Sequence, residues 1–432
     1  MSTLFTNVTA LLMDEDFTTL KNGYVAVEGA RITYVGADRP QGRFDETIDC
    51  TGKVMMPGFI NAHTHVPMTL LRGYGGGHDL HTWLNDYIFP AEAKLDDRAV
   101  AAGAALGLAE MISSGVTCIA EMYDHCDAII GEVLRAGISA NISRGTTLFA
   151  PNYDFSTFPG CVEQVEMAAK WHGCNGGQIR VDMSIHGEYT SRPELWRDLA
   201  AFAKDKGLRA HVHVSETQSE HEECIGRHGT TPIQILDQYG VWDNGGIAAH
   251  CVYTTPEDWA LMAEKGVSCA HNPYSNLKLG SGVAPIPAMR KAGVNVALGT
   301  DGMSSHNSAD LFADMKLAAI LHNGVAHDPM AITARDALEM ATIGGAKALG
   351  RTDTGRIAEG FTADLILVDF ESANLFPCHD PAENLVFAAH GSNVVMNMAR
   401  GKVIYRDGQF LTLDLEAIKA EVRQHALPLV FG

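Results

Sequence analysis

Apolar segments alternate with helix-period segments through the middle of the chain. Eight segments are apolar enough to form buried strands, namely 58–63, 116–122, 137–144, 179–186, 208–214, 246–250, 267–272 and 294–301. Segments 193–206 and 256–265 have helical periodicity, and we expect Ser191 and Thr255 to cap them and the glycines after them to end them. Because strands and helices alternate and no GxGxxG follows the first strand, an α/β fold with a closed (β/α)8 TIM-like barrel is favoured over an open doubly wound sheet.

Both ends of the chain show short strands separated by turn residues. The strand-like segments are 4–12, 23–28, 31–35 and 53–56 before the barrel, and 363–370, 394–399 and 402–405 after it. We predict that residues 1–56 and 356–432 form one small β-sandwich domain, interrupted in sequence by a barrel over residues 57–355. A helix is expected at the C-terminal end of the second part.

Length and charge narrow the classes of protein. The 432 residues suit a barrel of roughly 250 residues or more plus a smaller domain. A formal net charge of −20 opposes binding to nucleic acid or to anionic membranes, although it also serves solubility. A neutral or zwitterionic small molecule is a better partner for such a surface.

Cysteine usage and the N-terminal segment point to a cytoplasmic protein. The nine cysteines are odd in number and include no CxxC, which argues against a disulfide framework and against a cysteine zinc site. The first residues show no secretory signal pattern, and no apolar stretch approaches the roughly 18 residues of a membrane span. We also expect the protein to be a homo-oligomer.

Polar side chains end, or nearly end, most of the predicted barrel strands. They are His63, Arg144, His186, His213, His250, His271 and Asp301. Active sites of barrel enzymes are built at the carboxyl ends of the strands. The sequence therefore predicts that these side chains gather at one face of the barrel.

Two histidine pairs among these strand ends suggest a metal site. His63 and His65 are two residues apart, so both imidazoles can share a face, and His211 and His213 form a second such pair. With 19 histidines in 432 residues, about one H-x-H is expected by chance, so the strand-end positions carry the argument. Three imidazoles with Asp301 suit Zn²⁺ or a similar ion. A structural zinc site is normally closed by four protein ligands, often including cysteine. Since no cysteine joins this set, we predict a site with one position open to water. For His211 the favoured interpretation is packing within its strand.

The strings PGFINAHTHVPMTLLRG, HVHVSET, IAAHCVYTTPED, AHNPYSNLKLGSGVAP and LGTDGMSSHNS together resemble the amidohydrolase superfamily. The resemblance is greatest to its branch of methylthioadenosine/S-adenosylhomocysteine deaminases and chlorotriazine hydrolases, and it spans essentially the whole chain. It implies one zinc ion per subunit, or another divalent ion such as Fe²⁺, Mn²⁺ or Ni²⁺, held by His63, His65, His213 and Asp301. Two-metal members use a carboxylated lysine or a glutamate at the fourth strand, where this chain has His186 and no lysine.

The resemblance also implies catalytic roles. Zinc makes water nucleophilic near neutral pH, and a neighbouring carboxylate must move the protons. Glu216, three residues after His213, matches the glutamate that shuttles protons in the family. His250 matches the histidine that orients the nucleophile, and Asp301 would take a second proton while it stays on the metal.

The expected substrate is an aminopurine nucleoside. By resemblance Trp83, Glu92, Arg144 and His186 contact the substrate together with Glu216. Glu92 would accept hydrogen bonds from ribose hydroxyls, which favours deamination of methylthioadenosine, S-adenosylhomocysteine, adenosine or 5′-deoxyadenosine to the inosine analogue and ammonia. The alternative is a deaminase or dechlorinase of guanine, a pterin or a triazine, which needs no ribose-binding carboxylate. A metal-holding protein without activity would need neither Glu216 nor His250.

Two segments depart from the family pattern and leave the 5′ substituent open. Residues 73–78 read GYGGGH, where relatives often carry an acidic residue, and this suggests a looser loop over the pocket. Gly187 and Glu188 stand where relatives usually have Ala-Pro or Ser-Pro, which we expect to put an extra carboxylate near the substrate. Asn272 and Asn276 are interpreted as residues that shape a loop, without a catalytic role.

Overall fold

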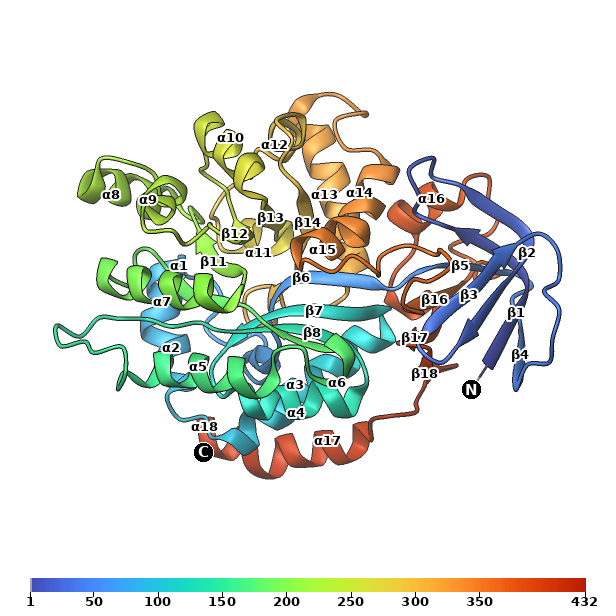
Figure 1. Ribbon diagram of the computed structural model, residues 1–432, viewed down its shortest axis with the longest axis horizontal. Helices are drawn as coiled ribbons and strands as arrows, with labels where there is room; N and C mark the ends of the chain where they lie inside the picture. The colour runs from blue at the N-terminus through green and yellow to red at the C-terminus, as the bar shows by residue number, and fades with distance from the viewer. Residues whose placement is uncertain (1) are drawn as a thin grey trace.

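The computed structural model describes residues 2–432 (Figure 1). At its centre lie two five-stranded parallel sheets, with the orders β15-β6-β7-β8-β9 and β10-β11-β12-β13-β14. The strands of the first are β6 (Phe59–His65), β7 (Val116–Tyr123), β8 (Ser139–Arg144), β9 (Ile179–Val181) and β15 (Asp301–Gly302). Those of the second are β10 (Met183–Gly187), β11 (Ala210–Val214), β12 (Gly246–His250), β13 (Val267–His271) and β14 (Val296–Leu298).

The two sheets join at both edges into one eight-stranded barrel. β9 and β10 are a single strand interrupted at Asp182, whose N–H bonds to the Ile142 carbonyl at 3.0 Å, while the next N–H turns to the Arg209 carbonyl at 2.8 Å. β14 and β15 are likewise parts of one strand, which pairs with β13 and then with β6. Each of the eight predicted strands is present. Parallel strands covered on both faces read as continuous apolar runs, which explains why the pattern identified them.

Helices surround the barrel on its outer side (Figure 1). They include α3 (Asp97–Ser113), α4 (Cys126–Ala136), α5 (Pro159–Trp171), α7 (Pro193–Lys206), α8 (Gln218–His228), α9 (Pro232–Gln238), α10 (Pro256–Lys265), α11 (Pro273–Lys278), α12 (Ile286–Lys291), α13 (Leu311–Ala326), α14 (Ala334–Ala341) and α15 (Ile343–Ala348). Both helices predicted from periodicity, α7 and α10, have the predicted bounds. Each ends at a glycine in the left-handed region, with φ of 65° at Gly207 and 67° at Gly266.

The two predicted caps had different outcomes. Thr255 caps α10 in a capping box with Asp258, as expected. The cap assigned to Ser191 was wrong, because Arg192 occupies the N-cap position of α7 without a side-chain cap bond. The Ser191 hydroxyl instead donates to the Gly187 carbonyl at 2.6 Å and accepts from Trp196 Nε1 at 2.6 Å. The hydroxyl is thus occupied by Gly187 and by the Trp196 side chain of α7, and it makes no bond to the first N–H groups of the helix.

The two ends of the chain form one nine-stranded sheet, drawn in blue and red in Figure 1. β16 lies between β5 of the first end and β17 of the second, and it pairs antiparallel with both. The strands are β1 (Ser2–Leu11), β2 (Thr19–Glu28), β3 (Arg31–Gly36), β4 (Glu46–Asp49), β5 (Lys53–Pro57), β16 (Leu365–Asp369), β17 (Val394–Ala399), β18 (Lys402–Arg406) and β19 (Gln409–Phe410). Apolar residues from both ends share one buried cluster, separate from that of the barrel.

The C-terminal segment folds back onto the barrel as α17 (Leu415–Glu421) and α18 (Leu427–Phe431). His425 lies 3.0 Å from Asp96 at the start of α3, and Lys94 Nζ donates to the Val430 carbonyl at 2.7 Å. The segment therefore supports the stretch of chain around Lys94 and Asp96, which leads into α3. Within residues 2–432, no helix combines the length and the apolar character that crossing a membrane requires.

Candidate active site

One cavity of about 360 Å³ lies where the carboxyl ends of the barrel strands meet. Its lining includes nearly all of the residues singled out from the sequence: His65, Trp83, Glu92, Arg144, His186, His213, Glu216, His250 and Asp301. His63 lies beneath the cavity and is fully buried. His271 is at a strand end but turns away, because its Nε2 lies 3.1 Å from Nε2 of His322. Strand-end position therefore located the cavity, with His271 as the exception.

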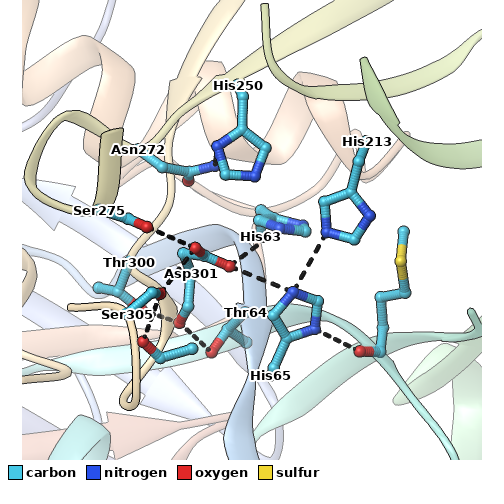
Figure 2. Close-up of polar contacts among 12 residues, drawn as sticks. His63, Thr64, His65, His213, His250, Asn272, Ser275, Thr300, Asp301 and Ser305 are labelled. Atoms are coloured by element: carbon cyan, nitrogen blue, oxygen red, sulfur yellow. Dashed lines mark hydrogen bonds and ion pairs between the residues drawn. The ribbon is translucent and has the colours of Figure 1, made fainter. Parts of the chain in front are cut away.

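Four donor side chains converge at the floor of this cavity (Figure 2). One atom each from His63, His213, His250 and Asp301 lie within 4.8 Å of one another. His65 adjoins this group, because its Nε2 lies 3.1 Å from Asp301 Oδ1 and 3.2 Å from His213 Nε2. The Nε2 of His63 is buried and makes no hydrogen bond to the described residues. Imidazole nitrogens and a carboxylate at this spacing fit a zinc-like divalent cation.

The second nitrogen of each histidine fixes the direction of its ring. Nδ1 of His65 donates to the Met122 carbonyl at 2.5 Å, and Nδ1 of His213 donates to the His186 carbonyl at 2.7 Å. Burial lowers the pKa of His63 to about 3, which keeps that imidazole in the neutral form a metal binds. The rings are thus held with Nε2 toward a common point, as outer hydrogen bonds hold metal-binding histidines in general.

His211 holds the ring of His63 in place. The sequence interpretation, which favoured packing of His211 within its strand, did not include this contact. The Ser143 hydroxyl donates to the Glu121 carbonyl at 2.9 Å, so it accepts from His211 Nδ1 at 3.2 Å. His211 Nε2 is then an acceptor, and it lies 2.8 Å from His63 Nδ1. This series of hydrogen bonds leaves Nε2 of His63 without a proton and facing the donor group. The H-x-H pair that includes His211 was the only signal in the sequence.

The two oxygens of Asp301 face different partners. Oδ1 faces the histidines, at 3.4 Å from His63 Nε2 and 3.1 Å from His65 Nε2. Oδ2 accepts from the hydroxyls of Ser275 at 2.6 Å and Ser305 at 2.8 Å (Figure 2). Burial acts to raise the pKa of Asp301, but the rings of His63 and His65 beside Oδ1 hold it well below its usual value. The carboxylate is therefore ionised and held in one orientation.

Glu216 and His250 form a second buried pair in the cavity. His250 Nε2 lies 3.7 Å from Glu216 Oε2, and both side chains are buried. His250 Nδ1 donates to Asn276 Oδ1 at 2.8 Å, so Asn276 does more than shape its loop, contrary to the sequence interpretation. Burial raises the pKa of Glu216 above its ordinary value. A carboxyl group in this state suits both proton uptake and proton release.

The loop that carries Glu216 is held by a residue that sequence reasoning did not identify. The Glu220 carboxylate accepts the backbone N–H groups of Ser215 and Glu216, each at 2.8 Å. Thr217 caps α8, and Thr217 with Glu220 has the T-x-x-E spacing of a capping box. That spacing was the available signal, although Glu220 reaches past the cap residue itself to the two residues before it.

The side wall of the cavity holds the predicted substrate contacts. Glu92 Oε1 accepts from the Tyr123 hydroxyl at 2.5 Å, and burial raises the pKa of Glu92 to about 7. Trp83, in the π-helical turn Trp83–Ile88, exposes only 5% of its surface. His186 Nδ1 lies 3.0 Å from the Thr190 hydroxyl. These side chains present aromatic surface and hydrogen-bonding groups to the same cavity.

One of the two departures from the family pattern does not place a carboxylate in the cavity as expected. Glu188 is 2% exposed and pairs with Arg227 at 2.6 Å and His228 at 2.9 Å. It does not line the catalytic cavity, so the expected extra carboxylate near the substrate was wrong. In the 73–78 loop, Tyr74 packs edge-on against Tyr87, and its ring centroid lies 5.0 Å from that of Phe431.

Comparisons with known proteins agree with this geometry. Residues 54–404 match the model described as Amidohydrolase family. The chain is 41% identical to a 5-methylthioadenosine/S-adenosylhomocysteine deaminase from Moorella thermoacetica, over 93% of this chain and 94% of that protein. It is 38% identical to a 5′-deoxyadenosine deaminase from Methanosarcina mazei, over 98% and 97% of the two chains.

Solved structures give the same picture. An adenosine deaminase from Xanthomonas campestris with bound zinc is 32% identical and superimposes with a TM-score of 0.92, over 99% of this chain and 98% of that one. The atrazine chlorohydrolase from Arthrobacter aurescens TC1, complexed with zinc, is 25% identical with a TM-score of 0.91, over 99% and 100%. Each likeness covers at least 98% of both chains, so it extends over the barrel and over both ends of this chain.

Proposed function

The chain belongs to the amidohydrolase family, and from this premise we propose that it is a zinc-dependent deaminase of adenine nucleosides. The products would be the inosine analogue and ammonia. The relatives named as deaminases of methylthioadenosine, S-adenosylhomocysteine and 5′-deoxyadenosine support this choice. The observation that carries it is a single cavity with the four-donor group and Glu216 at its floor and Glu92 on its wall.

We assign His63, His65, His213 and Asp301 as the ligands of one zinc ion per subunit, with Fe²⁺, Mn²⁺ or Ni²⁺ as ions that suit the same donors. The outer hydrogen bonds of the three histidines support the assignment, since each leaves Nε2 facing the donor group. Two structural neighbours contain zinc. When bound, zinc acts as a Lewis acid that makes water nucleophilic near neutral pH. His250 is then free to act on the water rather than on the metal.

The reaction adds water to the ring carbon that carries the amino group. Glu216 accepts one proton from the water and delivers it to the neighbouring ring nitrogen as the C–O bond forms. His250 accepts a hydrogen bond from the water, because its Nδ1–H is engaged by Asn276 and its Nε2 faces Glu216. The second water proton passes through Asp301 to the amino group. The C–N bond then breaks, and ammonia leaves.

Glu92 determines that the substrate is a nucleoside rather than a free base. Its carboxylate accepts hydrogen bonds from the ribose hydroxyls, while Trp83 packs against an apolar part of the substrate and His186 and Arg144 contact its polar edge. The bond from Tyr123 to Glu92 supports this role, because it holds one carboxylate oxygen in place and leaves acceptor capacity on the other.

A substrate panel tests the proposal. Ammonia release is measured with adenosine, methylthioadenosine, S-adenosylhomocysteine, 5′-deoxyadenosine, guanine, a pterin and atrazine, with and without a chelator. Turnover of at least one adenine nucleoside, abolished by the chelator and restored by zinc, supports the proposal. Turnover of guanine, the pterin or atrazine without any nucleoside would favour the second candidate, hydrolysis of another N-heterocycle, to which the likeness to atrazine chlorohydrolase points. Chelator-resistant turnover would overturn the metal assignment.

Three further features belong to the same proposal. The net charge of −20 supports a small-molecule substrate without nucleic acid or membrane partners. Free cysteines at all nine positions support a cytoplasmic location. Exposed apolar side chains at Ile320, Val325 and Met330, on and after α13, support assembly as a homo-oligomer. Light scattering in solution measures the last of these.

A further inference from the structure

We infer that the site selects nucleosides whose 5′ substituent is uncharged or cationic, and that it discriminates against a 5′ substituent that carries a carboxylate. This inference rests on the proposed function and narrows it. Among the substrates named for the relatives, it favours 5′-deoxyadenosine and methylthioadenosine over S-adenosylhomocysteine.

The argument starts from the arginine on the wall of the catalytic cavity. Within residues 2–432, Arg144 is the one arginine or lysine that lines the catalytic cavity. Its Nε donates to Glu163 Oε2 at 2.6 Å, and its Nη1 donates to Asp124 and to the Gly145 carbonyl. One guanidinium thus faces two carboxylates, and the group as a whole is negative. A substrate carboxylate would have to displace an existing ion pair to reach Arg144.

This group lies next to the residues proposed to hold the ribose. Arg144 is the neighbour of Tyr123 in the register of β7 and β8, and the Tyr123 hydroxyl donates to Glu92. Asp124 follows Tyr123 directly in sequence and lines the same cavity. A ribose bound at Glu92 therefore has the Arg144 group beside it, and a 5′ substituent must pass this group or leave on the opposite side.

The two cavities that share lining residues with the catalytic cavity are both acidic. A second cavity of about 820 Å³ shares Asp124, His125 and Arg144 with it, and contains the carboxylates of Asp97, Asp127, Glu163 and Glu166. Its remaining cation, Lys170, pairs with Asp127 at 2.6 Å. A third cavity of about 510 Å³ shares Leu80, Leu84, Phe89, Tyr189 and Leu279 with the catalytic one.

The third cavity repeats the pattern. Its exposed carboxylates are Asp79 and Glu223, since burial raises the pKa of Glu220 to about 8, and its one arginine or lysine among the described residues is Arg227. Arg227 pairs with Glu188 at 2.6 Å and with Glu223 at 3.2 Å. In both neighbouring cavities, every arginine and lysine of the described lining is already paired with a carboxylate. An anionic substituent would therefore meet like charges without a free partner, which costs affinity in a partly enclosed site.

The experiment compares adenosine 5′-thioethers that differ mainly in charge. The neutral probe carries a propylthio group, the cationic probe a 3-aminopropylthio group, and the anionic probe a 2-carboxyethylthio group. S-Adenosylhomocysteine, which carries both charges, is run alongside them. We expect kcat/KM for the anionic probe to be at least about tenfold below that of the neutral probe, with the loss mainly in KM. The cationic probe should match or exceed the neutral one.

One variant releases the arginine and a matched variant does not. Glu163→Gln removes a carboxylate from Arg144 while it keeps an oxygen for the N–H of Cys126, which Glu163 accepts at 3.1 Å. It should raise the ratio of anionic to neutral kcat/KM by about tenfold. Glu166→Gln removes the same charge from the same cavity without touching Arg144, and should change that ratio less. A partly unfolded sample lowers both probes alike, so the ratio is unaffected.

The outcomes distinguish failure of the charge selection from failure of the proposed function. If the anionic probe is turned over as well as the neutral one, or if Glu163→Gln leaves the ratio unchanged, the charge selection is wrong while nucleoside deamination stands. If none of the nucleosides releases ammonia, the proposed function itself fails.

Discussion

His211 Nε2 lies 2.8 Å from Nδ1 of His63, and both side chains are at most 1% exposed. The other two histidines assigned to the metal rest on backbone carbonyls, those of Met122 and His186, which no substitution removes directly. His63 alone depends on a side chain for its orientation and its tautomer. The metal affinity should therefore be sensitive at His211, although His211 has no atom facing the cavity.

We predict that His211→Ala lowers zinc affinity by about 10- to 100-fold, the usual cost of removing an outer partner of a ligand histidine. His211→Gln offers an oxygen to accept from His63 Nδ1 and an amide to donate to Ser143, so it should lose less. Competition with a fluorescent chelator measures the dissociation constant, and kcat is measured at saturating zinc.

A matched control separates this effect from loss of packing. His322 is also a buried histidine bonded to another histidine, at 3.1 Å from His271, but it lies outside the catalytic cavity. His322→Ala should lower thermal stability while zinc affinity stays at the wild-type value. Equal zinc affinities for His211→Ala and wild type would show that His211 only fills space.

Glu216 and the metal should be separable by substitution. Glu216→Gln keeps the shape of the side chain but cannot take up a proton, so kcat should fall by about 10²- to 10⁴-fold, the usual contribution of a general acid–base. Elemental analysis should still find one metal per subunit, because Glu216 is not among the proposed ligands. Wild-type turnover in this variant would remove Glu216 from the mechanism.

Metal content can decide whether His65 or His250 is the third histidine ligand. The compact donor group includes His250, whereas the assigned ligands include His65 in its place. His65→Ala should lower the bound metal well below one per subunit. His250→Ala should retain the metal and lose kcat, because His250 is held by Asn276 to act on the water. The reverse pattern of metal content would exchange the two roles.

The sequence specified the barrel and the location of the site better than it specified the contacts between residues. Buried parallel strands are recognisable as apolar runs, and chemistry at their carboxyl ends follows from the topology. The contacts of His211 and Asn276 were not predicted, because their partners lie 148 and 26 residues away in the sequence, respectively. Periodicity and motif spacing say which face a residue is on, but not which side chain it meets.

Glu188 shows the same limit of sequence interpretation, because it was expected near the substrate and lies elsewhere. Its position after His186 suggested a carboxylate near the substrate, yet Arg227 and His228 of α8 pair with it, and it does not line the catalytic cavity. The sequence around residue 188 contains no local pattern that predicts those partners. Ion pairs between elements thus decide whether a charged residue near a motif takes part in the site.

Glu92 should give the activity a pH dependence of its own. Burial raises its pKa to about 7 from an ordinary value of 4.5, so its carboxylate takes up a proton as the pH falls through neutrality. The ionised form accepts from both ribose hydroxyls and Tyr123, whereas the protonated form loses acceptor capacity. We therefore expect kcat/KM for a nucleoside to fall as the pH drops below about 7, with the change mainly in KM.

Glu92→Gln isolates this contribution from the other titrating groups of the site. The amide has the same shape and no proton to gain, so KM should be higher than in the wild type at pH 8 and should change little between pH 8 and pH 6. The wild type, in contrast, should approach the KM of the variant as the pH is lowered. Parallel KM profiles for the two proteins would mean that another group titrates in this range and that Glu92 does not contact the ribose.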